Sequence, residues 1–216
     1  MKNKIDIKIS KKYIDYLYAL NFMEKRVNKI INNKDKEMLW FLNHKHIYTC
    51  GTSSKKNEFI SKVNIPVFKT NRGGKTTYHG PGQRIVYFMI NLSNRKKDIR
   101  KFVTVIEESV ISILKDFEIE SKTYPDRIGI WVTKSKGIKL KKEKKIAAIG
   151  LRIKKWITYH GLSFNIDPDL KYYDKINACG LKNYKSTSLK ELEIELSKEE
   201  FDLLFYKKFK SNLTKI

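Results

Sequence analysis

The stretch IPVFKTNRGGKTTYHGPGQRIVYFMINL, residues 65–92, decides the architecture of this chain. Its beginning, 65–71, predicts a short strand, and its end, 84–92, is a nearly continuous apolar run typical of a strand covered on both faces. The loop between them, 72–83, holds four of the ten glycines and one of the four histidines. Glycine lets a ligand approach the backbone closely, and α/β proteins place ligands at strand ends. We therefore expect a sheet-centred fold with a site at this loop.

Helical periodicity appears on both sides of this stretch. Apolar residues at helical spacing predict three helices, over 11–33, 98–117 and about 198–212. The last of these begins with a capping box formed by Ser197 and Glu200.

Further apolar segments predict more strands. They lie over 37–44, running into 47–51, and over 128–133, 145–153 and 155–166. The last two are separated by a tight connection and should form a hairpin. The lysine-rich segment 134–145 is interpreted as a solvent-exposed turn or hairpin tip.

These elements indicate a mixed α/β fold of the α+β type, with a single sheet-centred domain and flanking helices. The domain is expected to span residues 1–216, with a motif-bearing core over about 37–185. The N-terminus lacks the apolar centre of a signal peptide, and the longest apolar run, 85–90, is too short to cross a membrane. A cytoplasmic protein without membrane contact is expected.

The charge balance is strongly basic, with 46 lysines and arginines against 23 acidic residues, a net charge of +23. Seven of the basic residues are arginine, the better donor for specific phosphate and base contacts. Solvated lysines on every face are therefore favoured over a specific nucleic-acid footprint. A basic surface would still favour an acidic protein partner.

The two cysteines, Cys50 and Cys179, fit no metal or disulfide spacing. Cys179 stands out because a glycine follows it, which leaves room for an acyl group and a nearby backbone N–H. A buried, inert cysteine is an equally good interpretation of this pattern alone. A reactive thiol needs an electropositive neighbour, for which Lys145, His79 and His160 are the candidates.

Other potential sites are weaker. His44 and His46 form an H-x-H pair without a clear third metal ligand, so packing or hydrogen bonding is favoured over a metal site. The glycine clusters match neither the G-x-x-x-x-G-K-[ST] loop nor the G-x-G-x-x-G fingerprint of nucleotide-binding proteins, so no nucleotide site is indicated. For any single glycine a turn remains the simplest role.

Several segments resemble the motifs of the lipoyl(octanoyl) transferase family. RGGKTTYHGPGQ (72–83) resembles its signature RGG-x-x-TYHGPGQ, and KIAAIGLRIKKWITYHGLSFNI (145–166) is similar to its second block. NACGL (177–181) matches the catalytic CG segment, and HKHIYTCG (44–51) and GIWV (129–132) resemble two shorter blocks. The matches follow the family's order over most of the chain.

The resemblance implies an acyltransferase of lipoate biosynthesis. It would move an octanoyl group from octanoyl-acyl carrier protein to a lysine of a lipoyl domain, in a 2-oxoacid dehydrogenase or the glycine cleavage H protein. The reaction would use a cysteine thioester, with no cofactor, metal or ATP. The implied fold is that of biotin and lipoate protein ligases, and an ATP-dependent ligase of this kind is the alternative function.

Carried over by position, the resemblance makes Cys179 the nucleophile and Lys145 the residue that favours its thiolate and later assists attack by the amine. The implied substrate-binding residues are Arg72, Gly73, Gly74, Lys75, Thr76, Thr77, Tyr78, His79, Ala148, Ile149, Gly150, Gly161, Leu162 and Ser163.

The chain departs from the family pattern at a few positions. Ala178 replaces the usual proline before the CG pair, and Ser163 and Phe164 replace Ala-Leu, where the phenylalanine is expected to alter packing near the acyl pocket. Lys142 and Lys144 compete with Lys145, although the register of KKIAAIG favours Lys145. The second TYHG, 158–161, is expected to end a strand beside the substrate loop, as a coincidental repeat.

Overall fold

The computed structural model describes residues 5–177 and 184–216. The strands of these residues are β1 (Asp6–Tyr13), β2 (Met38–Asn43), β3 (Ile47–Cys50), β4 (Val67–Lys69), β5 (Thr76–His79), β6 (Gln83–Met89), β7 (Ile119–Tyr124), β8 (Arg127–Ser135), β9 (Ile138–Lys154) and β10 (Ile157–Asn165). The α-helices are α1 (Tyr16–Ile31), α2 (Ile99–Asp116) and α3 (Lys198–Leu213). No helix of the described residues is long and apolar enough to cross a membrane.

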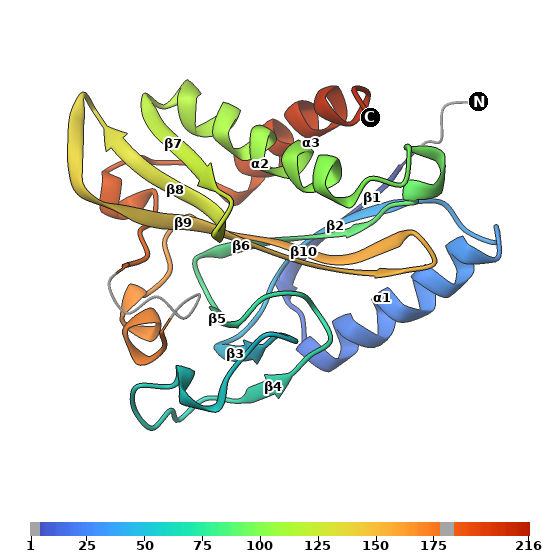
Figure 1. The fold of residues 1–216 in the computed structure, drawn as a ribbon, viewed down its shortest axis with the longest axis horizontal. Helices are drawn as coiled ribbons and strands as arrows, with labels where there is room; N and C mark the ends of the chain where they lie inside the picture. The colour runs from blue at the N-terminus through green and yellow to red at the C-terminus, as the bar shows by residue number, and fades with distance from the viewer. Residues whose placement is uncertain (1–4, 178–183) are drawn as a thin grey trace.

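The described strands form a seven-stranded sheet, β1-β2-β6-β10-β9-β8-β7, and a three-stranded sheet, β4-β3-β5. In the large sheet β1 pairs with β2 in parallel, and the remaining neighbours are antiparallel. Helices α2 and α3 lie over one face of this sheet, while α1 and the small sheet lie over the other (Figure 1). The predicted α/β class with flanking helices is confirmed.

Strand β6 shows why its sequence is apolar throughout. Val86 and Phe88 pack into the core under α2 and α3, whereas Ile85 and Tyr87 pack with α1. Because side chains alternate between the faces of a strand, a central strand covered on both faces needs apolar residues at successive positions. All seven residues of β6 are buried, as predicted.

Local signals set several element ends. The Asp15 side chain accepts a hydrogen bond from Tyr18 N and caps α1, and Ser197 and Glu200 form the predicted capping box of α3. Lys155 and Trp156, with φ of 45° and 65°, make the tight turn of the predicted β9–β10 hairpin.

The structure differs from the sequence predictions in four places. The helix predicted to begin at residue 11 begins at Tyr16, because 6–13 form a strand that pairs with β2. Strands β2 and β3 belong to different sheets rather than to one run, and part of the predicted glycine loop is strand β5. Most of the lysine-rich segment 134–145 is strand on either side of a turn at Lys136 and Gly137. The first three differences depend on pairing with strands distant in the sequence, whereas the last reflects the local β8–β9 hairpin, which is longer than predicted.

A buried ion pair fastens α3 to the large sheet. Arg84 of β6 donates to both carboxylate oxygens of Asp202, with distances of 2.8 and 2.5 Å, and also donates to Asn43 Oδ1 at 2.5 Å. Bidentate geometry with further hydrogen bonds is the arrangement that a buried pair requires.

Candidate functional site

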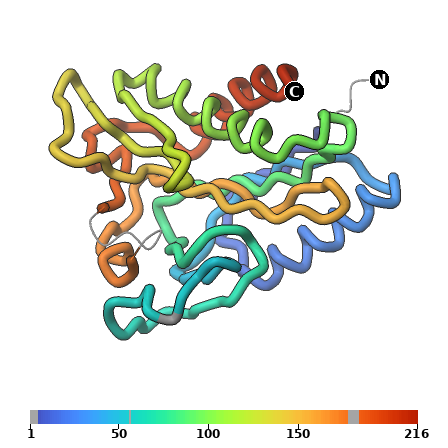
Figure 2. The backbone as a smooth tube through the Cα atoms, in the orientation of Figure 1, coloured from blue at the N-terminus to red at the C-terminus, as the bar shows by residue number. Residues whose placement is uncertain are grey.

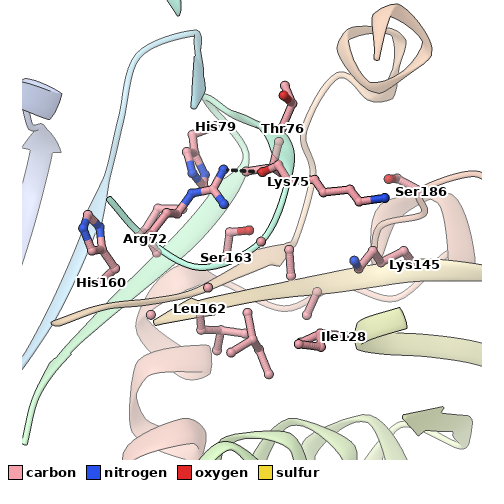
Figure 3. A pocket seen from close by; sticks show the side chains of 18 of the residues that line it. Arg72, Lys75, Thr76, His79, Ile128, Lys145, His160, Leu162, Ser163 and Ser186 are labelled. Carbon is pink, nitrogen blue, oxygen red and sulfur yellow. Dashed lines mark hydrogen bonds between the residues drawn. The ribbon is translucent and has the colours of Figure 1, made fainter. Parts of the chain in front are cut away.

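A cavity of about 230 Å³ lies on the face of the large sheet that α1 and the small sheet cover. Strands β6, β9 and β10 contribute to its walls, together with the glycine loop and β5. Lys145 and Ser186 lie toward one end of it, and Arg72, His79 and His160 toward the other (Figure 3). Segments far apart in the sequence therefore meet at one site.

Most of the residues predicted to bind substrate line this cavity, together with Lys145. They are Arg72, Gly74, Lys75, Thr76, Thr77, His79, Ala148, Ile149, Gly150, Gly161, Leu162 and Ser163. Gly73 and Tyr78 do not line it. Cys179 and Ala178 lie outside the described residues.

Gly73 instead connects the glycine loop to the sheet through its backbone. Its N–H donates to Leu151 O of β9 at 2.9 Å. Gly150 of β9 lies against the same part of the loop. A Cβ added to Gly150 would lie 2.9 Å from Gly73 O, too close for an ordinary contact. The glycines are therefore needed for close approach of the loop backbone to β9.

Tyr78 faces away from His79, since neighbouring side chains of a strand point to opposite faces. Its ring stacks on Tyr172 with centroids 4.7 Å apart, and its hydroxyl lies 2.8 Å from His46 Nδ1. Tyr78 thus packs in an aromatic cluster beneath the small sheet.

Arg72 holds the shape of the loop. Its guanidinium donates to Thr49 O at 2.6 Å and to Gly73 O at 2.9 Å. It also donates to Lys75 O at 2.8 Å (Figure 3). Three backbone carbonyls of two segments are tied to one buried side chain. These hydrogen bonds hold the loop conformation where it borders the cavity, and the guanidinium adds positive charge there.

Lys145 owes its direction to a bulge in β9. Ile130 pairs with Ala147 and Trp131 with Lys145, so Ile146 is an extra residue on this strand. Ile146 and Ala147 are both in the core under α2 and α3, whereas Lys145 lines the cavity, with Nζ 5.2 Å from the Trp131 ring centroid. Bulges often redirect side chains next to functional sites.

The chain that follows residue 184 runs beside β9 (Figure 2). There Lys145 N–H donates to Lys185 O at 2.9 Å, and Thr187 N–H donates to Lys145 O at 2.8 Å. Lys145 is thus bonded through its backbone to the segment that begins a few residues after Cys179.

The competing lysines lie elsewhere. Lys144 Nζ forms an ion pair with Glu191 at 3.0 Å, and Lys142 is exposed. Neither lines the cavity. The geometry therefore favours Lys145, as the register of the motif predicts.

The two cavity histidines are held neutral. Burial lowers the pKa of His160 to about 3, helped by the charges of Arg72 and Arg152. Burial also lowers the pKa of His79 well below its usual value, as do neighbouring His44 and Arg72. Of the three electropositive candidates near a reactive thiol, both histidines are thus uncharged at neutral pH, which leaves Lys145.

His160 also has an unusual backbone. Its φ of 60° lies in the left-handed region, which bulky residues rarely occupy. His160 Nε2 lies 3.0 Å from Asn71 Oδ1, a contact that ties the ring to the residue before Arg72. The second TYHG lies within β10 rather than at a strand end, so that prediction is wrong, and its histidine shares the cavity with His79.

We predict that stability falls as the pH drops below about 6.5, where histidines of the unfolded chain gain protons. The folded-state pKa values are lowered, to about 4 for His44 and about 3 for His160, so the unfolded state binds more protons and stability is lost as pH falls toward these values. Each such histidine contributes a slope of about 1.4 kcal/mol per pH unit.

Urea unfolding between about pH 7 and pH 5 measures this slope. His44→Asn should flatten it by one histidine's share, because His44 Nδ1 and Nε2 are held by Ile14 O and Tyr87 Oη in the fold. A stability that does not change over this range would contradict the buried, neutral state of these rings.

Three other predictions concern residues near the site. Cys50 does not line the cavity, and its Sγ lies 3.5 Å from Thr76 Oγ1. His44 is a hydrogen-bonded core residue, as favoured, and no three metal-ligating side chains gather anywhere in residues 5–177 and 184–216.

Phe164 was expected to alter packing near the acyl pocket, but it points to the opposite face and stacks on Phe201 with centroids 4.6 Å apart. Alternation along β10 explains that correction.

Sequence reasoning missed several lining residues, namely Tyr16, Ser53, Ile85, Tyr87, Asp126, Arg127, Ile128, Ala147, Asn165, Tyr173 and Ser186. Ile85 and Tyr87 share one face of β6, and their spacing was a usable signal. Arg127 had none, because its position depends on stacking against Tyr124 and Tyr184, whose ring centroids lie 3.8 and 4.4 Å from its guanidinium carbon.

Comparison with known proteins adds an independent line of evidence. The description "Lipoyl protein ligase A/B catalytic domain" belongs to a family model that matches residues 15–210. The octanoyltransferase of Ehrlichia chaffeensis is 47% identical over 206 residues, which cover 95% of this chain and 94% of that protein. The octanoyltransferase of a Wolbachia from Brugia malayi is 45% identical, with 93% and 96% covered.

Solved structures agree in fold. A bipartite lipoate protein ligase from Thermoplasma acidophilum superposes with a TM-score of 0.69 at 14% identity, covering 99% of this chain and 84% of that one. Biotin protein ligase from Aquifex aeolicus gives a TM-score of 0.52 at 12% identity, with 99% and 70% covered. The expected kinship in fold with lipoate and biotin protein ligases is confirmed.

Proposed function

This chain belongs to the lipoyl protein ligase A/B catalytic domain family and is an acyltransferase of protein lipoylation, and on that premise we propose its donor, acceptor and chemistry. It takes an octanoyl group from octanoyl-acyl carrier protein, holds it as a thioester on Cys179, and passes it to a lysine of a lipoyl domain. The acceptor domains are those of 2-oxoacid dehydrogenases or the glycine cleavage H protein.

One observation carries the proposal. Lys145 is buried in the cavity wall, and its backbone is bonded to Lys185 and Thr187, shortly after the CG segment. If Cys179 lies beside Lys145, the lysine supplies the cation that favours a thiolate over a thiol.

In the first step, the Cys179 thiolate attacks the carbonyl carbon of the donor thioester. The tetrahedral intermediate collapses, the C–S bond to the carrier breaks, and the new thioester forms on Cys179. The carrier's thiolate takes a proton from solvent and the Lys145 ammonium releases one, so Lys145 is neutral before the second step. Because one thioester replaces another, the step needs no ATP. Ile85 and Ala148 contribute apolar side chains to the cavity lining, which suits an alkyl chain.

In the second step, the neutral amine of the acceptor lysine attacks the Cys179 thioester. The C–N bond forms, the C–S bond breaks, and the amine loses one proton. Lys145 takes that proton in its neutral form, and Cys179 leaves as the thiolate. A positioned base of this kind contributes roughly 10²- to 10⁴-fold. Amide formation from a thioester runs downhill, so this step needs no ATP either.

The proposal is tested by mixing the purified protein with octanoyl-acyl carrier protein in the absence of ATP. Intact mass and peptide mapping should show one octanoyl group on Cys179, and addition of a lipoyl domain should discharge it onto a lysine. An octanoyl group found on another residue would overturn the proposal. So would lipoyl-domain octanoylation that requires ATP and leaves no acyl-enzyme, which is the behaviour of a ligase.

A further inference from the structure

A groove of about 770 Å³ lies beside the cavity, over strands β7, β8 and β9. Five lysines line it, namely Lys122, Lys134, Lys139, Lys141 and Lys142. The hairpin that carries most of them is the densest run of positive charge in the chain, with seven lysines among residues 134–145. Lysines are therefore more concentrated at this groove than the general lysine content of the chain would predict.

Most of this charge is not neutralised within the described part of the chain. Lys134 pairs with Glu120 at 2.9 Å, and Glu143 accepts from Tyr124 Oη at 3.0 Å and lies 3.7 Å from Arg127. The other four lysines of the groove form no ion pair with a carboxylate of residues 5–177 or 184–216. The groove thus presents several charges to a partner.

The groove adjoins the cavity. Arg127 lines the cavity, and its guanidinium stacks on Tyr124 and Tyr184, which line the groove. Along β9 the chain runs from Lys145 at the cavity to Lys139 in the groove. At about 3.3 Å per residue these six steps span up to about 20 Å.

We propose that this groove docks the acidic carrier protein of the acyl donor, an inference that rests on the proposed function. Opposite charge would guide the carrier to the β8–β9 hairpin and hold it there. The carrier's acyl group, at the end of its flexible prosthetic arm, then enters the cavity at the Lys145 end.

The distance between the groove and Lys145 favours the acyl donor over the acceptor as the protein that docks in the groove. An acyl carrier delivers its thioester on a long arm, so its body can rest on the groove up to about 20 Å from Lys145. An acceptor lysine has only its own side chain for reach, so its domain must come up to the cavity mouth itself. A binding surface displaced along the hairpin fits the first partner.

The test is charge reversal in the groove with two kinds of donor. The triple variant Lys139→Glu, Lys141→Glu, Lys142→Glu should raise KM for octanoyl-acyl carrier protein about tenfold or more. Its turnover of octanoyl-pantetheine, a small thioester without the protein, should stay within about twofold of the unmodified enzyme. The KM effect should shrink as salt rises, because exposed charges are screened.

A matched control carries the same change of charge on other elements. Lys25 and Lys29 on α1 and Lys207 on α3 are exposed, and their replacement by glutamate should leave both donors' KM values near those of the unmodified enzyme. Equal effects of the two triple variants would mean that net charge alone acts, which overturns the docking site. A raised KM for the lipoyl domain with an unchanged KM for the carrier would assign the groove to the acceptor and also overturn it. Absence of turnover of octanoyl-acyl carrier protein by the unmodified enzyme would instead count against the proposed function.

Discussion

Cys179→Ala is expected to lower octanoyl transfer by roughly 10³-fold or more and to remove the acyl-enzyme completely. The proposed reaction splits one acyl transfer into two thioester steps, and alanine has no atom that can hold the acyl group between them. Direct attack by the acceptor lysine on the carrier thioester would have to replace both steps. Single-turnover assays with labelled octanoyl-acyl carrier protein measure the acyl-enzyme and the product separately.

Cys50→Ala is the matched control for this prediction. Cys50 is the other cysteine of the chain, and its Sγ lies by Thr76 Oγ1 outside the cavity lining. Transfer by this variant should stay within about twofold, since a small change at a partly buried position away from the reacting atoms affects stability only modestly. Loss of transfer in Cys50→Ala and its retention in Cys179→Ala would overturn the assignment of the nucleophile.

Lys145→Met is expected to lower transfer by about 10²- to 10⁴-fold, the range for loss of a positioned acid or base. Methionine has similar length and fits a buried site, but it cannot favour a thiolate or take a proton. Alkylation of Cys179 by iodoacetamide across pH should show the thiol titrating at higher pH in this variant. A purely structural lysine would not change that titration.

Lys145→Arg separates the two roles. Arginine keeps a positive charge but does not release its proton, so acyl-enzyme formation should persist while transfer to the acceptor lysine becomes slow. Lys144→Met is the control, because Lys144 pairs with Glu191 and does not line the cavity. The proposed role of Lys145 would be wrong if Lys144→Met lost as much activity as Lys145→Met. It would also be wrong if the Lys145 variants changed neither the titration of Cys179 nor the rate of transfer to the acceptor lysine.

Resemblance to the family motifs predicted about half of the cavity lining, from Arg72 to His79 and on both strands of the β9–β10 hairpin. It could not separate residues that face the cavity from those that support it. Tyr78 belongs to the motif, yet its side chain packs against Tyr172 because β5 pairs with β3 and fixes which face is inward. Gly73 serves through its backbone, at a contact with Leu151 that lies far away in the sequence.

The sequence by itself determined the elements whose signals are local. The all-apolar β6, the amphipathic α2 and the capping box of α3 follow from spacing within a few turns or strand steps. Tertiary structure alone decided what depends on distant pairing. The extra residue Ile146 turns Lys145 toward the cavity, and burial keeps His79 and His160 neutral. Strand register and desolvation are properties of neighbours brought together by the fold, so no short window of sequence contains them.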